Sequence, residues 1–359
     1  MNTDGHDAAT LKSTEDDMSP NPTVPRIQTA SEDLSKTISS YTISNRRKAL
    51  YQIIDTFVPF LALWAIMVWM MHHEYSYWMI LALALPTAGF QVRIFILFHD
   101  CCHGSFFESR RANAILGTIS GILTFTPFAQ WRRAHATHHD SVGDLDRRGV
   151  GDIWLMTVEE YEAASRMERI AYRLVRNPYG MLLVGPFIVF LIMHRFYRKS
   201  DYRQERIGVV ATDIAVAAIF VAAWLTIGLG TYCFIQAPVM FFAGAAGLWL
   251  FYVQHQFEGV YWARHDTWNR LKAALEGSSY YKLPALLRWF TGNIGLHHIH
   301  HVQQRIPNYN LQQCYDDVPA LRNVTPLTLR RSLRCLPLNL WDEKQGKLVS
   351  FRSLRAVPF

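Results

Sequence analysis

Histidine side chains are concentrated in three short windows of this chain. Nine of its 15 histidines lie in HDCCH (99–103), HATHH (135–139) and HHIHH (297–301). Imidazole nitrogen is a ligand suited to iron, zinc, copper and nickel, and few other roles bring so many imidazoles together. A composition this biased is typical of metal binding. The windows therefore predict a metal centre assembled from distant parts of the sequence.

The spacing inside each window places ligands on one face of a helix. His99 and His103 are four residues apart, and His135 and His138 are three apart, so each pair projects from one side. His139 diverges from His138 by about 100°, so the two can serve different metals or two sides of one. The third window repeats this arrangement. The eight predicted ligands are His99, His103, His135, His138, His139, His297, His300 and His301. Because they exceed the coordination number of one ion, they indicate two metals.

Histidines and polar residues outside this repeat are further candidates. His255 ends a long apolar stretch, and we expect it to be a ninth ligand. His298 interrupts the spacing of the third window, so we expect it to support a ligand or to act as a spacer. Four polar residues near the windows are candidates to orient imidazoles through hydrogen bonds, with ordinary turn and capping roles as the alternative: Asp100, Asp140, Asp144 and Asn293.

Four apolar segments are long enough to hold these windows at a membrane. They cover approximately residues 50–71, 77–98, 207–229 and 233–254, and a membrane-spanning helix needs about 20 residues. The short connections within the first and second pairs contain no Lys or Arg, and basic residues cluster at the opposite ends. The positive-inside rule therefore predicts that both termini and all three windows face the cytoplasm.

Two shorter apolar stretches, residues 112–128 and 180–193, lie between successive windows. If either one crossed the membrane alone, neighbouring windows would lie on opposite sides and could not share a metal site. We therefore expect both stretches to be interfacial or re-entrant segments.

The predicted fold class is an all-α integral membrane protein. Four transmembrane helices and the interfacial helices would carry a cytoplasmic helical cap, residues 99–206 and 255–359, that holds the histidine-rich site. Residues 1–44 are polar, so we expect a disordered tail ahead of a single domain, 45–359. This tail lacks the basic and apolar regions of a secretory signal peptide.

Several classes of function are disfavoured by the same sequence. The net charge of +7 comes from basic residues beside apolar segments, which favours contact with anionic lipid over nucleic acid. The five cysteines contain no Cys-x-x-Cys pair, so we expect neither a disulfide framework nor a thiolate zinc site. The chain lacks the His-Glu-x-x-His sequence of a zinc protease. A metal transporter would carry its ligands inside the spans, whereas these lie at their edges.

The windows and the sequence around them resemble those of the membrane fatty acid desaturase superfamily. Longer strings make the resemblance specific to the bacterial acyl-lipid desaturases of the omega-6 (delta-12) type, over roughly residues 90–316. These strings are SVGDLDRRGVGDIW after the second window, VQHQFEGVYW around His255, GSSYYKLP, and TGNIGLHHIHHVQQRIPNY around the third window.

The resemblance implies a function as well as a fold. Members of this superfamily use two non-haem irons and O₂ to introduce a cis double bond into an acyl chain, here expected to be lipid-linked in a bacterial inner membrane. The eight window histidines and His255 would be the iron ligands. Cys102 stands where the superfamily usually has glycine, and no fused cytochrome b5 domain is recognisable, so electrons would come from an external donor such as ferredoxin or cytochrome b5. A di-iron hydroxylase of alkanes or carotenoids, or a non-catalytic metal-binding or transport protein, are the alternatives.

Overall fold

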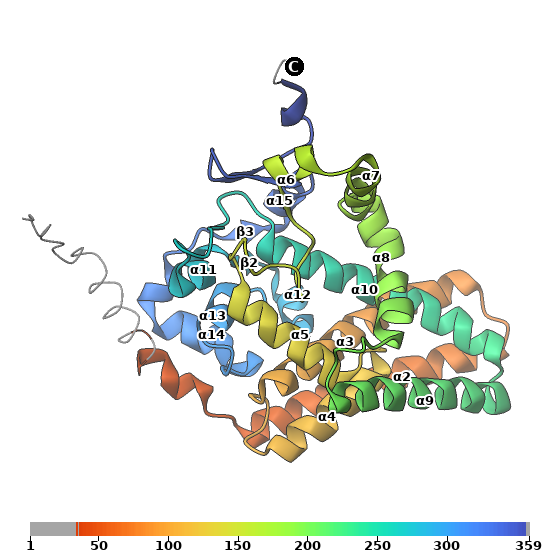
Figure 1. The fold of residues 1–359 in the computed structure, drawn as a ribbon. Coiled ribbons are helices and arrows are strands. Elements are labelled where there is room, and N and C mark those ends of the chain that lie inside the picture. The colour runs from red at the N-terminus through yellow and green to blue at the C-terminus, as the bar shows by residue number, and fades with distance from the viewer. Residues whose placement is uncertain (1–33, 35, 357–359) are drawn as a thin grey trace, which may run out of the picture.

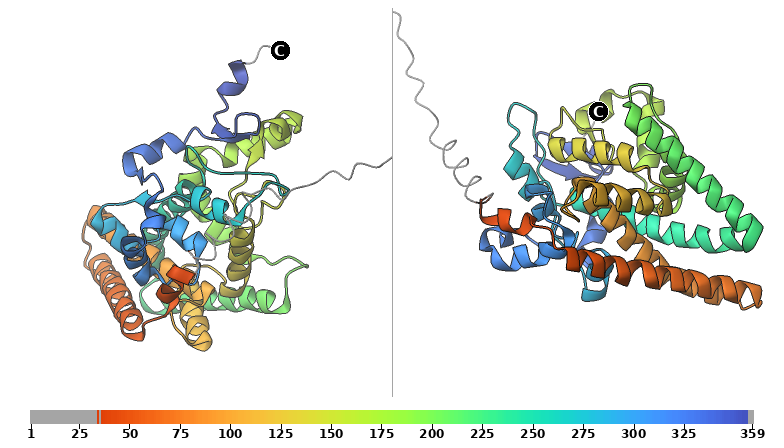
Figure 2. Two further views of the ribbon diagram at one scale, coloured as in Figure 1. Left: turned by 90° about the vertical axis from the view of Figure 1, so that its left-hand side faces the viewer. Right: turned by 90° about the horizontal axis from the view of Figure 1, so that it is seen from below.

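Two long helical hairpins form the framework of the structure. In this computed structural model, which describes residue 34 and residues 36–356, α2 (Arg46–His72) pairs with α3 (Tyr77–His103), and α9 (Arg203–Thr226) pairs with α10 (Leu229–His255). The hairpins extend together from one side of the molecule, and the shorter elements gather at the other (Figures 1 and 2). All four helices are long and apolar enough to cross a membrane, which confirms the four predicted spans.

Local sequence explains where these helices begin and end. The Asn45 side chain caps α2 by accepting a hydrogen bond from the Lys48 amide. α3 ends at Gly104, whose φ of 66° is a left-handed conformation that favours glycine, directly after the first histidine window. The second hairpin turns at residues 227–228, slightly earlier than expected, because Gly228 also adopts a positive φ of 86° there.

α3 lies at the centre of the helical assembly and packs against α2, α10 and α4 (Arg110–Leu123). Buried apolar residues along these helices, including Met67, Ile80, Ala84 and Val239, form one continuous core. This packing carries the last turn of α3, and with it the first histidine window, into the interior of the protein.

The two shorter apolar stretches lie within bent helix pairs. α4 meets α5 (Phe128–Ser141) at an angle of 101°, and α7 (Arg166–Val175) meets the helical segment Gly180–Arg195 at 67°. By length and composition, the structure has four candidate spans, or up to six if each bent pair is one span. The segment Gly180–Arg195 combines η2 (Gly180–Val184) and η3 (Ile188–Ile192), both π-helical, with α8 (Gly185–Phe187) and η4 (Met193–Arg195).

The bend between α4 and α5 has a clear cause in the sequence. Pro127 precedes α5, and a residue before proline is disfavoured in helical conformation. The Thr126 amide folds back to donate to the Gly121 carbonyl at 2.7 Å. A Cβ on Gly121 would lie only 2.4 Å from the Thr126 oxygen, so the close approach requires glycine.

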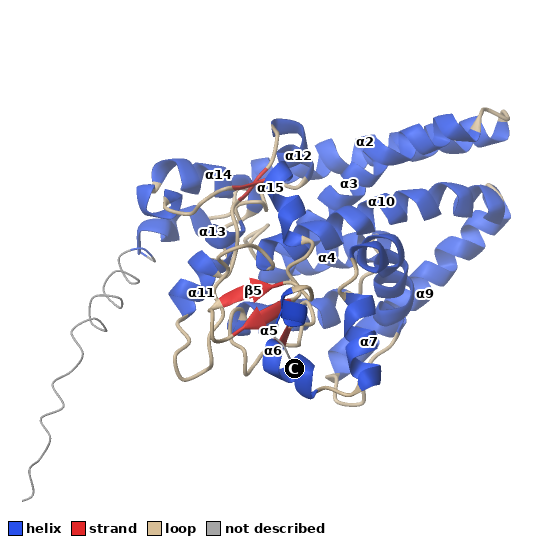
Figure 3. Cartoon of the chain, turned by 90° about the horizontal axis from the view of Figure 1, so that it is seen from above, coloured by secondary structure: helices blue, strands red, loops and turns tan. Residues whose placement is uncertain are grey.

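The remaining elements form a cap that is mostly helical. The strands are two or three residues long and lie within this cap (Figure 3). β1 pairs parallel with β4, which pairs antiparallel with β5, and β2 pairs parallel with β3. The elements are η1 (Ser40–Thr42), β1 (Met156–Thr157), α6 (Val158–Ala163), α11 (Arg270–Glu276), β2 (Tyr281–Lys282), α12 (Ala285–Phe290), α13 (His297–Val302), α14 (Asn308–Asp317), η5 (Pro319–Arg322), β3 (Leu327–Thr328), α15 (Leu329–Ser332), η6 (Leu333–Cys335), β4 (Leu340–Asp342), β5 (Lys347–Val349) and η7 (Ser353–Ala356).

The end of the predicted disordered tail is ordered, which corrects its boundary at residue 44. Residues 36–42 are helical, and residues 1–33 lie outside the described part of the chain. Ile38 is fully buried in a cluster with Leu311 and Leu321. The Tyr41 hydroxyl donates to the Asp317 carboxylate at 2.9 Å. The prediction missed this contact because the sequence around Ile38 is polar, and only the C-terminal part of the cap buries the Ile38 side chain.

Removing this contact should lower stability. Replacing Ile38 with alanine leaves a cavity in the cluster, which should reduce the free energy of unfolding by about 2–5 kcal/mol. Thermal unfolding in detergent measures the change. Ile43→Ala is the matched control because Ile43 is 71% exposed. An equal unfolding midpoint for the two variants would contradict the docking of this segment.

Candidate metal centre

The three histidine windows and the end of α10 meet in one buried region. The first window ends α3, the second lies in α5, the third forms most of α13, and His255 is the last residue of α10. The histidines form two groups, and within each group the potential ligand atoms all lie within 4.8 Å of one another. The first group is His99, His103, His135, His139 and His300, and the second is His138, His255, His297 and His301. The structure thus brings together all nine histidines that the sequence predicts as ligands, namely the eight from the windows and His255.

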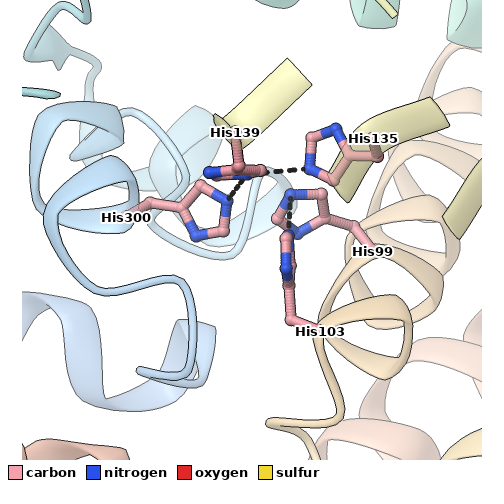
Figure 4. Close-up of side chains that lie close together, drawn as sticks. All are labelled: His99, His103, His135, His139 and His300. Atoms are coloured by element: carbon pink, nitrogen blue, oxygen red, sulfur yellow. Dashed lines mark hydrogen bonds between the residues drawn. The ribbon is translucent and has the colours of Figure 1, made fainter. Parts of the chain in front are cut away.

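In the first group the imidazole rings converge from three helices (Figure 4). His139 Nε2 lies 3.1 Å from His135 Nε2 and 3.0 Å from His300 Nε2. The Nε2 atoms of His99 and His103 are 3.3 Å apart. Five nitrogen donors this close can surround a single transition-metal ion.

In the second group the same atoms face one another. His255 Nε2 lies 3.1 Å from His138 Nε2 and 2.9 Å from His297 Nε2, and His301 Nε2 lies 3.1 Å from His297 Nε2. The His301 ring stacks on the His139 ring of the first group, with centroids 4.1 Å apart. The two groups are therefore neighbours within one site.

Helix geometry divides the adjacent histidines between the groups. His138 and His139 follow one another on α5, and His300 and His301 on α13, yet each pair contributes one member to each group. Consecutive helical side chains diverge by about 100°, so one helix can reach two sites at once. As the helical spacing predicted, adjacent histidines face two different groups, and the structure shows which histidine belongs to which group.

Burial keeps the imidazoles of His297, His300 and His301 on α13 in the form that binds metal. Eight of the nine are at most 9% exposed, and His103 is half-buried. On α13, which lies outside the candidate spans, burial and neighbouring imidazoles lower the pKa values of His297, His300 and His301 well below the ordinary value of 6.5. A neutral ring has the lone pair that ligation requires. All-nitrogen groups fit a borderline metal such as iron or zinc, and fit poorly the oxygen ligation that magnesium or calcium prefers.

Hydrogen bonds to the outer nitrogens orient several of these rings. Asp152 Oδ1 lies 2.5 Å from His138 Nδ1, and the Gly277 carbonyl accepts from His255 Nδ1 at 3.1 Å. Such contacts turn Nε2 inward and raise the basicity of the ligand. Sequence reasoning did not single out Asp152, although it lies in the GVGDIW string after the second window. The signal was present there, but only the folded loop brings Asp152 to His138.

Asp100 is the one predicted orienting residue whose carboxylate approaches a ligand. Its Oδ1 lies 3.4 Å from His99 Nδ1, a long contact, and its Oδ2 accepts hydrogen bonds from the backbone and side chain of Asn308. Asp100 therefore anchors α14 to α3 as much as it orients the ring.

The other four predicted supporting residues have different partners. Among the hydrogen bonds of the described residues, none joins them to a ligand imidazole, so the structure does not support that role for them. The exposed Asp140 pairs with Arg270, Asp144 with Arg147 and His265, Asn293 donates to the Asn308 carbonyl, and His298 Nε2 lies 3.0 Å from the Leu321 carbonyl.

A largely apolar cavity of about 810 Å³ adjoins the histidines. His99, His135 and His297 form part of its wall, so both groups border it. The remaining wall comes mostly from apolar side chains of α3, α10 and the segment Gly180–Arg195. The Trp131 indole also lines the cavity and stacks on the His135 ring, with centroids 4.3 Å apart.

Comparisons with known proteins identify sequences similar to this one. The model of the family described as fatty acid desaturase matches residues 76–325. A Bacillus subtilis protein named fatty acid desaturase is 44% identical over 91% of this chain and 92% of its own length. Two Synechocystis proteins are each 27% identical: an sn-1 oleoyl-lipid 12-desaturase, over 61% of this chain and 62% of its own length, and an sn-1 acyl-lipid omega-3 desaturase (ferredoxin), over 64% of each chain.

Loss of the Asp152 carboxylate should weaken metal binding. Asp152→Asn removes the charge that orients His138, so we expect the affinity for an added divalent metal to fall about 10- to 100-fold. Anaerobic titration of the metal-free protein with Fe²⁺ measures this. Asp140→Asn, a change of the same kind at an exposed residue, should bind as the unaltered protein does. Equal affinities for the two variants would remove Asp152 from the site.

Acidification should destabilise the metal-free protein. Burial lowers the pKa of His298 to about 4, whereas an unfolded histidine titrates near pH 6.5. Between these values the unfolded chain binds more protons, so the free energy of unfolding falls as the pH falls, by up to about 1.4 kcal/mol per pH unit for each imidazole that stays neutral. Thermal unfolding at about pH 7 and about pH 5 tests the sign. A midpoint that rises on acidification would contradict the neutral state of these rings.

Proposed function

The chain belongs to the fatty acid desaturase family, and on that premise we propose that its two histidine groups bind two iron ions and serve to introduce a cis double bond into an acyl chain. As a member of this family it is an oxidoreductase. The observation that carries the proposal is the meeting of two all-nitrogen groups at the wall of one apolar cavity. The proposed ligands are His99, His103, His135, His139 and His300 for one iron, and His138, His255, His297 and His301 for the other.

The residues of the chain would bind the irons and exclude water from them. Bound iron would supply the activation of O₂ that is needed to remove hydrogen from an unactivated C–H bond, which no side chain can do. The imidazoles would hold the metals, and the Asp152 carboxylate keeps the His138 ring in position. Trp131 covers the His135 ring on the cavity side. A dry site of this kind protects a reactive centre from side reactions.

The shape and chemistry of the cavity support an acyl chain as substrate. Its volume of about 810 Å³ lies within the range of small-molecule sites. Each buried methylene contributes about 0.8 kcal/mol, so an apolar wall can hold a long chain without polar contacts. Holding a flexible chain in one geometry beside the metals is an orientation effect, and it selects the carbons that react.

The proposed acyl carrier, the position of the double bond and the electron donor are supported by the similar proteins. The similarity to an sn-1 oleoyl-lipid 12-desaturase supports a lipid-linked substrate and a double bond of the delta-12, or omega-6, type. The similarity to an omega-3 desaturase (ferredoxin) supports an external donor such as ferredoxin, with cytochrome b5 as another candidate. His103 is the only half-buried member of the nine, which supports its side of the site as the entry route for electrons.

We further propose that the protein is integral to the membrane, in bacteria the inner membrane, with both termini and the histidine windows in the cytoplasm. The four candidate spans support the membrane location. The distribution of Lys and Arg supports the orientation, because both hairpin connections lack them. Acyl tails of the bilayer would then reach the cavity while their headgroups stay hydrated.

Heterologous expression tests this function. In a host that lacks diunsaturated fatty acids, the protein and a matching electron donor should produce acyl chains with one additional double bond. His300→Ala should abolish the product because it removes a ligand of the first group, whereas membrane insertion should be unchanged because the spans are untouched. Gas chromatography of the lipids and iron analysis of the purified protein measure both effects.

The control is His298→Gln, which keeps a donor for the Leu321 carbonyl and should retain most activity. Hydroxylated acyl chains in place of dienes would favour the hydroxylase alternative. About one zinc per chain and no product would favour a non-catalytic metal-binding protein. Full activity of His300→Ala would contradict the ligand assignment.

A further inference from the structure

Two glycines in the middle of α10 differ in what surrounds them. Apart from proline, glycine is the least favourable residue inside a helix, so each calls for a physical reason. A Cβ on Gly244 would lie 2.7 Å from Pro186 Cβ and 3.2 Å from the Phe190 ring. Close packing against the segment Gly180–Arg195 therefore explains Gly244. A Cβ on Gly247 would meet nothing within 4 Å, so packing does not explain that glycine.

The free space beside Gly247 belongs to the apolar cavity. The residues of α10 that line the cavity recur along one face of the helix, and at 100° per residue Gly247 lies near the middle of this face. The lining residues of α10 are Met240, Ala243, Gly244, Gly247, Leu248, Leu250, Phe251 and Gln254. The cavity wall contains other glycines, but a Cβ on Gly151, Gly180, Gly185 or Gly244 would lie within 3 Å of a neighbouring atom. Among the lining glycines of the described residues, Gly247 is the one that leaves open space.

The position of Gly247 relative to the histidines is set by the helix. It precedes His255 by two turns, which corresponds to about 12 Å along the helix axis. The cavity wall also includes Val184 and Ile188, whose segment is partly π-helical, and such irregular turns are frequent at functional sites. The open space beside Gly247 therefore lies at a defined distance from His255 along the helix.

We infer that Gly247 determines which acyl chains the cavity accepts, because the missing side chain leaves room for the distal part of a bound chain. This inference rests on the proposed function for the class of ligand. A side chain at this position would occupy the space that the longest chains need. Chains short enough to end before residue 247 would bind as before.

Graded substitutions of Gly247 test this role. Gly247→Ala and Gly247→Leu introduce good helix formers into open space, so both variants should fold. Each methylene that loses its place in the cavity weakens binding by about fourfold. We therefore expect Gly247→Leu to weaken binding of the longest chains at least about tenfold and to leave binding of the shortest chains unchanged. The affinity of Gly247→Ala for the longest chains should lie between those of the unaltered protein and Gly247→Leu.

The measurement is displacement of a photoactivatable fatty acid from the purified, iron-loaded protein in detergent, by saturated fatty acids of increasing length. Gly230→Leu is the matched control, because Gly230 lies on the same helix, is exposed, and also has open space around its Cβ. The iron content of every variant should equal that of the unaltered protein.

Each outcome bears on a different statement. A length dependence that shortens in Gly247→Leu and not in Gly230→Leu supports the inference. An unaltered length dependence in Gly247→Leu, or the same change in Gly230→Leu, overturns it while the proposed function stands. If the unaltered protein binds no fatty acid, the inference fails, and the lipid analysis after heterologous expression decides separately on the proposed function.

Discussion

The structure depends on holding nine imidazoles face to face in a region from which water is largely excluded. Facing Nε2 atoms lie 2.9 to 3.3 Å apart, and each neutral ring has only one proton to share, so a cation is the natural partner for the remaining lone pairs. Such an arrangement persists only if the helices around it are anchored. Asn308 supplies one anchor, since it donates to the Asp100 carboxylate and exchanges hydrogen bonds with Gln52. This buried network ties α2, α3 and α14 together directly beside the histidines.

α10 combines three tasks that follow from its length and sequence. It is apolar enough to cross a membrane, it forms one wall of the cavity, and it ends in His255. The cavity is therefore connected to His255 by a rigid element, so that the distance between the cavity wall and this histidine depends on helix rise and little on loop flexibility. Gly244 lets the segment Gly180–Arg195 approach this helix closely, and that approach completes the wall of the cavity.

Bends in two helix pairs allow distant histidine windows to share one site. After the first window the chain leaves along α4, turns by 101° at Thr126 and Pro127, and returns as α5 with the second window. α5 is then held from outside by the ion pair between Arg133 and Glu205 of α9, at 3.1 Å. The family model matches residues 76–325 and so spans these elements and all three windows. The scaffold and the ligands thus form one unit that extends over most of the chain.

The sequence by itself determined the spans and the candidate ligands, because hydropathy and the spacing of histidines are local properties. Four apolar stretches and nine imidazoles could be read from residue types alone. The helical repeat also predicted that the side chains of His138 and His139 point in different directions and can serve different sites. The tertiary structure alone decided the membership of each group, the contact between Asp152 and His138, the burial of Ile38 and the gap at Gly247. It also directed Asp140, Asp144, Asn293 and His298 to partners other than the ligands. These features are contacts between segments far apart in the chain. Tertiary packing decides which segments meet, and a local sequence pattern contains no information about it.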